Sequence, residues 1–502
     1  MGAAAQAAPA PSPSPTPAAP AAAEADAGGT PDAVTQHTIA VSGRTIAYTA
    51  RAGTIALYDK KEQPTARVFY TAFTEDLVAA STRPVTFIYN GGPGSSTMWL
   101  RMGSIGPVRV LATNGTSSGP PPYRVVDNPY TLLDKSDLVF IDMPDSGFGR
   151  IVAGKEKEYF GVDQDIAAFG QFITRYVSRF DRWNSPKFLF GESYGTTRSS
   201  GLSYWLLNHG VGLNGVILLS SYLNAGLENN YGAPIGGGDW GYALYLPTEA
   251  ATAWYHHRVA NAPADLPTYL NEVKQFALGE YLDALYRGDT LSPAARDDVI
   301  RKLSRYTGLP QQFIKNGGIR VSYDRFQREL LRSQGRVVGR LDGRFTTYAT
   351  DRSTLEGPQW DPTDSAIDSA YTAAVNQYIR QTLKYNPNIN YRGQIYDIIY
   401  ADGSSWDNSH NGRYPMNVAP DLAEAMTQNP NLKVFSANGY YDFATPFFET
   451  YYVLTHLNVA PAIESNISYG YYESGHMVYL NDSVIGQFKA DLARWYDSAT
   501  AR

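Results

Sequence analysis

The sequence predicts an α/β protein in which a central, mostly parallel β-sheet is flanked by helices and carries a largely helical insertion. Short apolar segments, typical of buried parallel strands, recur in the first and last parts of the 502-residue chain. Segments of helix length separate them, as in strand–helix–strand units. Between about residues 225 and 425 the pattern becomes helical. These observations together favour one sheet with an inserted lid.

The composition excludes several classes of protein. The chain has 42 Lys and Arg against 48 Asp and Glu, a net charge of −6, and no basic block, so we expect no nucleic-acid partner. It has no run of about 18 apolar residues, so we expect no membrane span. Cysteine is absent, which excludes disulfides, thiol catalysis and cysteine-bound metal. Aromatic residues make up 13%, which suits a protein with a binding cleft.

Residues 1–34 consist almost entirely of small residues and proline. They offer too little apolar surface to offset the entropy of ordering, so we expect a disordered tether. The segment has no charged start followed by a long apolar stretch, so it is not itself a secretion signal. It resembles the flank left after a signal is removed, which favours export to a periplasmic or secreted location, although a cytosolic linker has the same composition.

The core is expected to comprise residues 35–224 and 426–502. Its predicted strands are 38–50, 66–74, 85–89, 138–141, 187–190, 215–219, 433–437 and 467–472, with helices over 163–180 and 196–209. Residues 225–425 are expected to form the helical insertion, a lid or cap on the sheet. Within it, Ser292 and Pro293 begin a helix that ends near Gly308, and a helical stripe recurs over 364–383.

The sharpest local signal is Gly191-Glu-Ser193-Tyr-Gly195, which follows the apolar strand KFLF and precedes a helix-like segment. This context is typical of a nucleophile elbow, in which a serine occupies a strained strand-to-helix turn and the glycines avoid clashes. A second match at residues 115–119 runs directly into Pro120, Pro121 and Pro122, so it is expected to be a loop. Ser193 is therefore the candidate nucleophile, and a plain tight turn is the alternative.

A serine nucleophile needs a base and an orienting acid, which follow it in the order Ser, Asp, His in α/β-hydrolases. His476 comes directly after an apolar strand and is the preferred base. His209 and His456 lie in helical runs, and the adjacent His256 and His257 lack the spacing of a zinc pair. Asp442, after the strand KVFSAN, is the preferred acid, with helix capping as the alternative. Asp402, Asp407 and Asp421 rank below it.

An oxyanion hole requires two backbone N–H donors. The N–H of Tyr194, directly after the nucleophile, supplies one. The glycine-rich segment 90–94 (NGGPG), after the strand 85–89, supplies the other, because glycine lets the backbone approach a substrate oxygen closely. No Lys-Ser/Thr pair follows at the spacing of a phosphate loop, and a plain turn is the alternative.

Five ordered segments, FIYNGGPGSSTMWLRMGSIGP, IDMPDSGFG, FGESYG, SANGYYDFATP and SGHMVY, resemble the signature blocks of the serine carboxypeptidase family. The resemblance implies an α/β-hydrolase fold with a helical insertion, and cleavage of peptides at a free C-terminus. It implies a triad of Ser193, Asp442 and His476, with the N–H groups of Gly92 and Tyr194 as oxyanion donors. It also implies that Asn90, Glu192 and the Gly91 N–H bind the substrate carboxylate.

Glu192 can accept a carboxylate partner only while it holds a proton, since two like charges at hydrogen-bond distance repel. Eukaryotic members of the family place a second Glu nearby, but the matching residue here is Ser104. Ser95 likewise replaces the family's cysteine. Both departures favour a bacterial-type member and leave the acidic pH preference open.

The sequence therefore predicts a serine carboxypeptidase that forms an acyl-enzyme on Ser193 and needs no metal or organic cofactor. Its expected partners are peptides with a free C-terminus. An esterase or acyltransferase using the same triad is the alternative, because ester and peptide chemistry share these residues. A non-catalytic binding protein that kept the fold is a further alternative.

Overall fold

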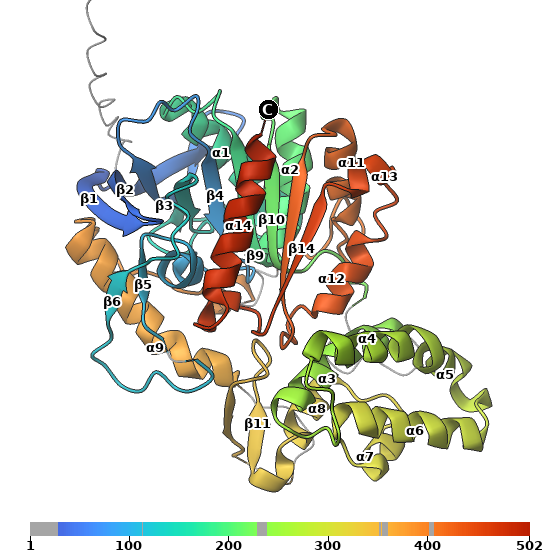
Figure 1. The fold of residues 1–502 in the computed structure, drawn as a ribbon. Helices are drawn as coiled ribbons and strands as arrows, with labels where there is room; N and C mark the ends of the chain where they lie inside the picture. The colour runs from blue at the N-terminus through green and yellow to red at the C-terminus, as the bar shows by residue number, and fades with distance from the viewer. Residues whose placement is uncertain are drawn as a thin grey trace, which may run out of the picture.

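The computed structural model describes residues 29–112, 114–227, 238–350, 353, 360–400 and 406–501. A ten-stranded sheet forms its centre (Figure 1). The strand order is β1-β2-β3-β7-β4-β9-β10-β13-β14, and β8 pairs with β3. The strands from β7 to β14 in this order are parallel, whereas β1, β2 and β3 pair in antiparallel fashion. The predicted mostly parallel sheet is therefore confirmed.

The strands of this sheet are β1 (Ala33–Val41), β2 (Arg44–Tyr58), β3 (Pro64–Glu75), β4 (Val85–Tyr89), β7 (Asp137–Ile141), β8 (Arg150–Ile151), β9 (Lys187–Ser193), β10 (Gly215–Ser221), β13 (Lys433–Gly439) and β14 (Ile467–Tyr472). Two small antiparallel pairs are β5 (Val108–Val110) with β6 (Val125–Asp127), and β11 (Arg336–Val338) with β12 (Thr346–Tyr348).

The helices that accompany the sheet are α1 (Val162–Arg179), α2 (Tyr194–Asn208), α9 (Pro362–Gln377), α10 (Tyr396–Ile399), α11 (Ala419–Gln428), α12 (Phe447–Leu454), α13 (Pro461–Glu464) and α14 (Ile485–Thr500). Those of the separate helical unit are α3 (Asp239–Tyr255), α4 (Leu266–Phe276), α5 (Leu282–Arg287), α6 (Pro293–Thr307), α7 (Gln311–Asn316) and α8 (Tyr323–Glu329).

Both faces of the sheet are buried, because alternate residues of each strand point into different cores. In β4, Ile88 joins the core beneath α9 and α14, whereas Phe87 and Tyr89 join the core beneath α1, α2 and α11. All five residues of β4 and of β7 are buried. This two-sided burial explains why the parallel strands are continuous apolar runs in the sequence.

Near the N-terminus, the structure differs from the prediction in two places. The predicted strand over 38–50 is two strands, since Ser42 and Gly43 both adopt left-handed backbone (φ 50° and 77°) and reverse the chain between β1 and β2. Residues 1–28 of the predicted tether lie outside the described residues. β1 begins at Ala33, so the boundary drawn at residue 34 falls inside a strand.

The helical region predicted as a single insertion over 225–425 is divided between different cores. Helices α3 to α8 share a third core, which also takes in Phe447 and Phe448 of α12. Helix α9 instead belongs to the core on one face of the sheet, where Tyr371 lies against Trp99 with ring centroids 4.9 Å apart. The helical stripe in 364–383 thus faces this core and not the core of helices α3 to α8.

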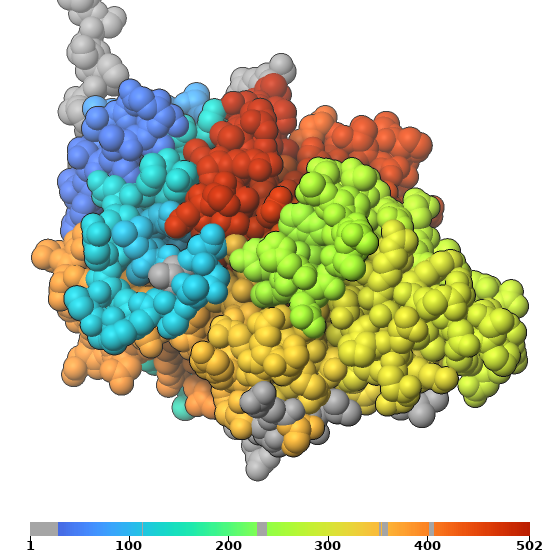
Figure 2. Space-filling model, turned by 60° about the horizontal axis from the view of Figure 1, so that its bottom comes forward, coloured from blue at the N-terminus to red at the C-terminus, as the bar shows by residue number. Residues whose placement is uncertain are grey.

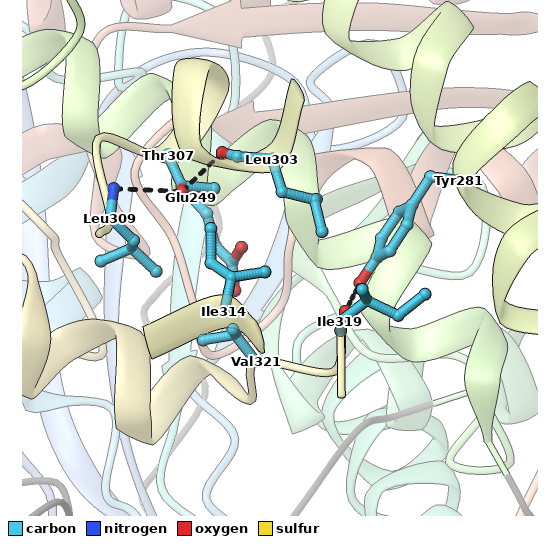
Figure 3. A pocket seen from close by; sticks show the side chains of 8 residues that line it. All are labelled: Glu249, Tyr281, Leu303, Thr307, Leu309, Ile314, Ile319 and Val321. Carbon is cyan, nitrogen blue, oxygen red and sulfur yellow. Dashed lines mark hydrogen bonds between the residues drawn. The ribbon is translucent and has the colours of Figure 1, made fainter. Parts of the chain in front are cut away.

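The unit formed by α3 to α8 covers much of the lower side of the molecule, shown in green to gold in Figure 2. Its interior holds a small pocket lined mainly by aliphatic side chains together with Glu249 and Tyr281 (Figure 3). Burial raises the pKa of the Glu249 carboxyl to about 8. Among the described residues, no helix is long and apolar enough to cross a membrane.

Candidate active site

Ser193 lies at the end of β9, directly before the first residue of α2, with a left-handed backbone (φ 62°, ψ −133°). A Cβ on Gly191 would lie 2.1 Å from the carbonyl oxygen of Gly195, and one on Gly195 would lie 2.9 Å from that of Tyr89. The turn therefore requires glycine at both positions, as a nucleophile elbow does. It presents Ser193 at the N-terminus of α2, where the helix favours negative charge.

Asp442 and His476 follow the two strands β13 and β14 and meet at the same edge of the sheet. The Nδ1 atom of His476 lies 2.8 Å from Asp442 Oδ2. Asp442 is fully buried and also accepts hydrogen bonds from the backbone N–H groups of Ala444 (2.8 Å) and Thr445 (3.0 Å). It does not cap α12, whose N-cap position is Pro446. The carboxylate is thus fixed and oriented toward the imidazole, with Nδ1–H as the donor.

The backbone places His476 beside the elbow. Ser220 Oγ donates to the carbonyl oxygen of His476 at 2.7 Å, and Ser221, the next residue of β10, is paired in the sheet with Ser193. Asp442 and Thr445 are the imidazole's hydrogen-bond partners among the described residues, so Ser193 Oγ is not bonded to it in this conformation. Burial lowers the pKa of His476, but the charge and hydrogen bond of Asp442 outweigh burial and raise it above the ordinary value.

The segment 90–94 lies against the elbow. A Cβ on Gly91 would lie 2.5 Å from the backbone nitrogen of Tyr194, so the two backbone segments are in contact there. Gly92 has a left-handed backbone (φ 112°), which favours glycine. The segment after β4 and the start of α2 therefore bring the backbones of the two predicted donors, Gly92 and Tyr194, to one place.

Asn90 and Glu192 form a buried pair next to the elbow. Asn90 Nδ2 donates to Glu192 Oε1 at 2.7 Å, while Asn90 Oδ1 accepts from the N–H of Leu100 at 3.0 Å, which fixes the amide. Both side chains are 3% exposed. Burial raises the pKa of Glu192 to about 7, although the nearby His476 and the hydroxyl of Tyr479 act to lower it. The carboxyl therefore holds a proton near neutral pH without a second Glu, and the matching Ser104 is buried.

The family's sequence profile, described as serine carboxypeptidase, matches residues 51–479. This protein belongs to the serine carboxypeptidase family.

Curated relatives agree with this assignment. The chain is 23% identical over 184 residues to serine carboxypeptidase-like 36 of Arabidopsis thaliana, covering 35% of this chain and 36% of the relative. It is 25% identical over 183 residues to carboxypeptidase Y homolog A of Talaromyces stipitatus, covering 36% and 31%. The chain thus spans about a third of the length of these relatives.

The crystal structure of Kex1(delta)p, a prohormone-processing carboxypeptidase from Saccharomyces cerevisiae, superimposes with a TM-score of 0.51 at 15% identity. The match covers 89% of this chain and 91% of that chain. At this identity the match speaks for the fold alone. It confirms the predicted α/β-hydrolase fold of this serine carboxypeptidase family member.

Sequence reasoning missed a buried ion pair that supports the site. Arg198 of α2 donates to Asp165 of α1 at 2.7 Å and to the carbonyl oxygen of Asn90 at 2.8 Å. Its guanidinium also lies over the rings of Phe169 and Tyr194, 3.9 and 5.4 Å from their centroids. The pair thereby links the elbow helix α2 to the glycine-rich segment 90–94. An arginine among small residues on the helix after the elbow was its only sequence signal.

The other histidines have different surroundings in this family member. His209 stacks on Trp205 and His456 on Tyr452. His256 bonds the carbonyl oxygen of Gly343 at 2.7 Å. His410, in contrast, lies between the carboxylates of Asp163 (2.6 Å) and Asp421 (3.0 Å). Burial opposes its charge, but these hydrogen bonds outweigh burial and raise the pKa of His410 to about 9.

Proposed function

We propose that this protein is a serine carboxypeptidase that removes the last residue of peptides with a free C-terminus. The buried Asn90–Glu192 pair beside the elbow carries the proposal, because a protonated carboxyl next to the nucleophile can donate a hydrogen bond to the terminal carboxylate of a peptide. With its pKa raised to about 7 by burial, Glu192 can donate a hydrogen bond to a substrate carboxylate. Asn90 Nδ2 and the N–H of Gly91 would supply further donors.

In the proposed mechanism, His476 Nε2 takes the proton of Ser193 while Oγ attacks the carbonyl carbon of the last peptide bond. The oxyanion accepts hydrogen bonds from the N–H groups of Gly92 and Tyr194. The imidazolium, stabilised by Asp442, gives its proton to the leaving amine, and the free amino acid departs. Water then attacks the acyl-enzyme, again with His476 as base, and releases the shortened peptide and the free serine.

For this to happen, the Ser193 hydroxyl must turn toward the imidazole. The backbones that carry the two residues already lie together, because Ser220 is bonded to the carbonyl oxygen of His476 and Ser221 is paired with Ser193 in the sheet.

Two measurements test the proposal. A fluorophosphonate probe should label the wild type and the Ser117→Ala variant, which alters the second GxSxG match, but not Ser193→Ala. A blocked dipeptide should be cleaved about 30- to 100-fold more efficiently as the free acid than as the C-terminal amide, because the amide leaves buried polar groups mispaired. Equal values of kcat/KM for the two substrates would remove Asn90 and Glu192 from their assigned role, and cleavage of esters alone would favour an esterase.

We propose export as the location of this activity, supported by the composition of residues 1–34. The assignment to a bacterial branch stays a prediction that rests on Ser95 and Ser104.

A further inference from the structure

A hairpin of the inserted region reaches the catalytic edge of the sheet. Its strands are β11 and β12, and we call residues 339–345, which connect them, the hairpin tip. In Figure 1 the hairpin, in yellow, extends upward toward the lower end of β14. Its residues lie more than 90 positions from Asp442 and more than 130 from His476 in most cases, so sequence proximity does not explain their contacts.

The hairpin tip bonds first to the aspartate loop, residues 440–445, which carries Asp442. The N–H of Phe443 donates to the carbonyl oxygen of Arg340 at 2.9 Å. The N–H of Gly343 donates to the carbonyl oxygen of Tyr441, also at 2.9 Å. These bonds lie on both sides of Asp442, so the tip holds the backbone that carries the acid.

The tip bonds equally to the histidine loop, residues 473–477, which carries His476. The N–H of His476 itself donates to the carbonyl oxygen of Leu341 at 2.6 Å. The N–H of Gly475 donates to Asp342 Oδ2 at 3.1 Å, and Arg344 Nη2 donates to Ser474 Oγ at 3.1 Å. Three consecutive residues of the loop are therefore tied to one tip.

Asp342 and Arg344 form the centre of these contacts. Their side chains are 1% and 2% exposed, and Arg344 Nη2 lies 2.5 Å from Asp342 Oδ2. A Cβ on Gly475 would lie 2.4 Å from that of Asp342, so only glycine permits this approach. Burying two charges costs desolvation that their attraction does not reliably offset, so such a pair is weak evidence for a role in stability. Its position between two catalytic loops suggests another role.

We propose that Asp342, held by Arg344, is a positioning residue that fixes the His476 and Asp442 loops relative to one another. The inference rests on the proposed function, because it assumes that this histidine and aspartate act in catalysis. The carboxylate restricts Gly475 directly and His476 through the adjacent backbone. It thereby limits how far the imidazole can move from the position in which it accepts the proton of Ser193.

The consequence for kinetics is specific. The groups assigned to the substrate carboxylate lie on the segments after β4 and within β9, which the tip contacts given above do not involve. Loss of the Asp342 charge should therefore leave KM nearly unchanged. Displacement of a catalytic group by about 1 Å or the loss of an outer supporting partner lowers kcat by about 10- to 100-fold.

The test compares Asp342→Asn with a matched control, Asp137→Asn. Asp137 is also buried and is bonded to two arginines, Arg83 (3.0 Å) and Arg182 (2.6 Å). It is the first residue of β7, however, and therefore lies at the amino ends of the parallel strands, away from the carboxyl ends that Asp442 and His476 follow. For Asp342→Asn we expect kcat and the rate of fluorophosphonate labelling to fall by about 10- to 100-fold, with KM within about twofold of the wild type. The deshielded proton NMR signal of His476 Nδ1–H should broaden or vanish. The control should lower the melting temperature without these changes.

The possible outcomes are distinct. Unchanged kcat and labelling in Asp342→Asn, or an equal loss of kcat in the control, would overturn the positioning role. If Asp342→Asn does not fold, the double variant Asp342→Asn/Arg344→Gln, which leaves no unpaired charge, replaces it in the same measurements with the same expected losses. A wild type that neither reacts with the probe nor cleaves peptides would overturn the proposed function itself, whereas an active wild type with unaltered variants overturns only this inference.

Discussion

Replacing Glu192 by Gln should remove the alkaline limb of the pH profile for substrates with a free C-terminus. In the proposed function the wild-type carboxyl donates to the substrate only while protonated, and burial raises its pKa to about 7. Glutamine keeps the shape and an N–H donor but does not titrate. The variant should therefore bind the carboxylate at alkaline pH, where the wild type has lost its proton and meets the substrate with a like charge.

The size of the effect follows from the raised pKa. With a pKa of about 7, about 90% of Glu192 is protonated at pH 6 and about 10% at pH 8. The wild-type kcat/KM for a free acid should thus fall about tenfold between these values and about 90-fold by pH 9.

The assay is kcat/KM from pH 5 to 9 for one blocked dipeptide as free acid and as C-terminal amide. The amide serves as the internal control, because it has no terminal carboxylate to bind to or to be repelled by Glu192 in either protonation state. The wild-type decline should appear with the free acid alone and disappear in Glu192→Gln. A variant that declines about tenfold between pH 6 and 8 on the free acid, as the wild type should, would refute the reasoning.

Three further predictions concern other titrating or orienting groups. Asp442→Asn should lower kcat by about 10⁴-fold with little change in KM, measured on the same dipeptide, because the amide favours the wrong imidazole tautomer. His410→Gln should lose up to about 3 kcal/mol of unfolding free energy below pH 6.5, and progressively less as the pH rises through about 9, where the wild-type histidine itself loses its proton. Equal losses at pH 6 and 10 in thermal melts would contradict this. Glu249→Gln should match the wild type near pH 5 and exceed its melting temperature at pH 9. In the unfolded wild type the carboxyl ionises above its ordinary pKa, whereas burial keeps it protonated in the folded protein up to about pH 8, so the wild type loses stability between these pH values. A variant less stable at both pH values would speak against it.

Local signals were sufficient to predict the elbow and the central strands. The strand before Ser193, the glycines on either side and the helix after it lie within about twenty residues, so pattern and steric requirement act together. Asp442 and His476 were also accessible, because each follows an apolar strand and parallel strands end at the same edge. In the sequence the central strands are continuous apolar runs, so the sequence did not show which of their residues point into which of the two cores.

Features that depend on contacts between distant segments could not be predicted. Nothing in the sequence around Asp342 indicates that it meets Gly475, 133 residues away, and the stripe of α9 gives no sign of which surface it covers. The turn at Ser42 and Gly43 was missed for a different reason, since the segment was predicted as one alternating strand. The Ser-Gly pair and the change of buried positions from odd (Ile39, Val41) to even (Ile46, Tyr48) mark the reversal.

The left-handed backbone of Ser193 has an evolutionary consequence. A residue with a side chain in such a region carries about 1–3 kcal/mol of strain, which glycine would not carry. In the proposed mechanism, selection for turnover therefore holds a serine where selection for stability alone would place a glycine. A descendant relieved of catalysis would drift toward glycine between Glu192 and Tyr194 and become more stable by doing so. That single substitution in a homologue would mark a lineage that has kept the scaffold and abandoned the chemistry.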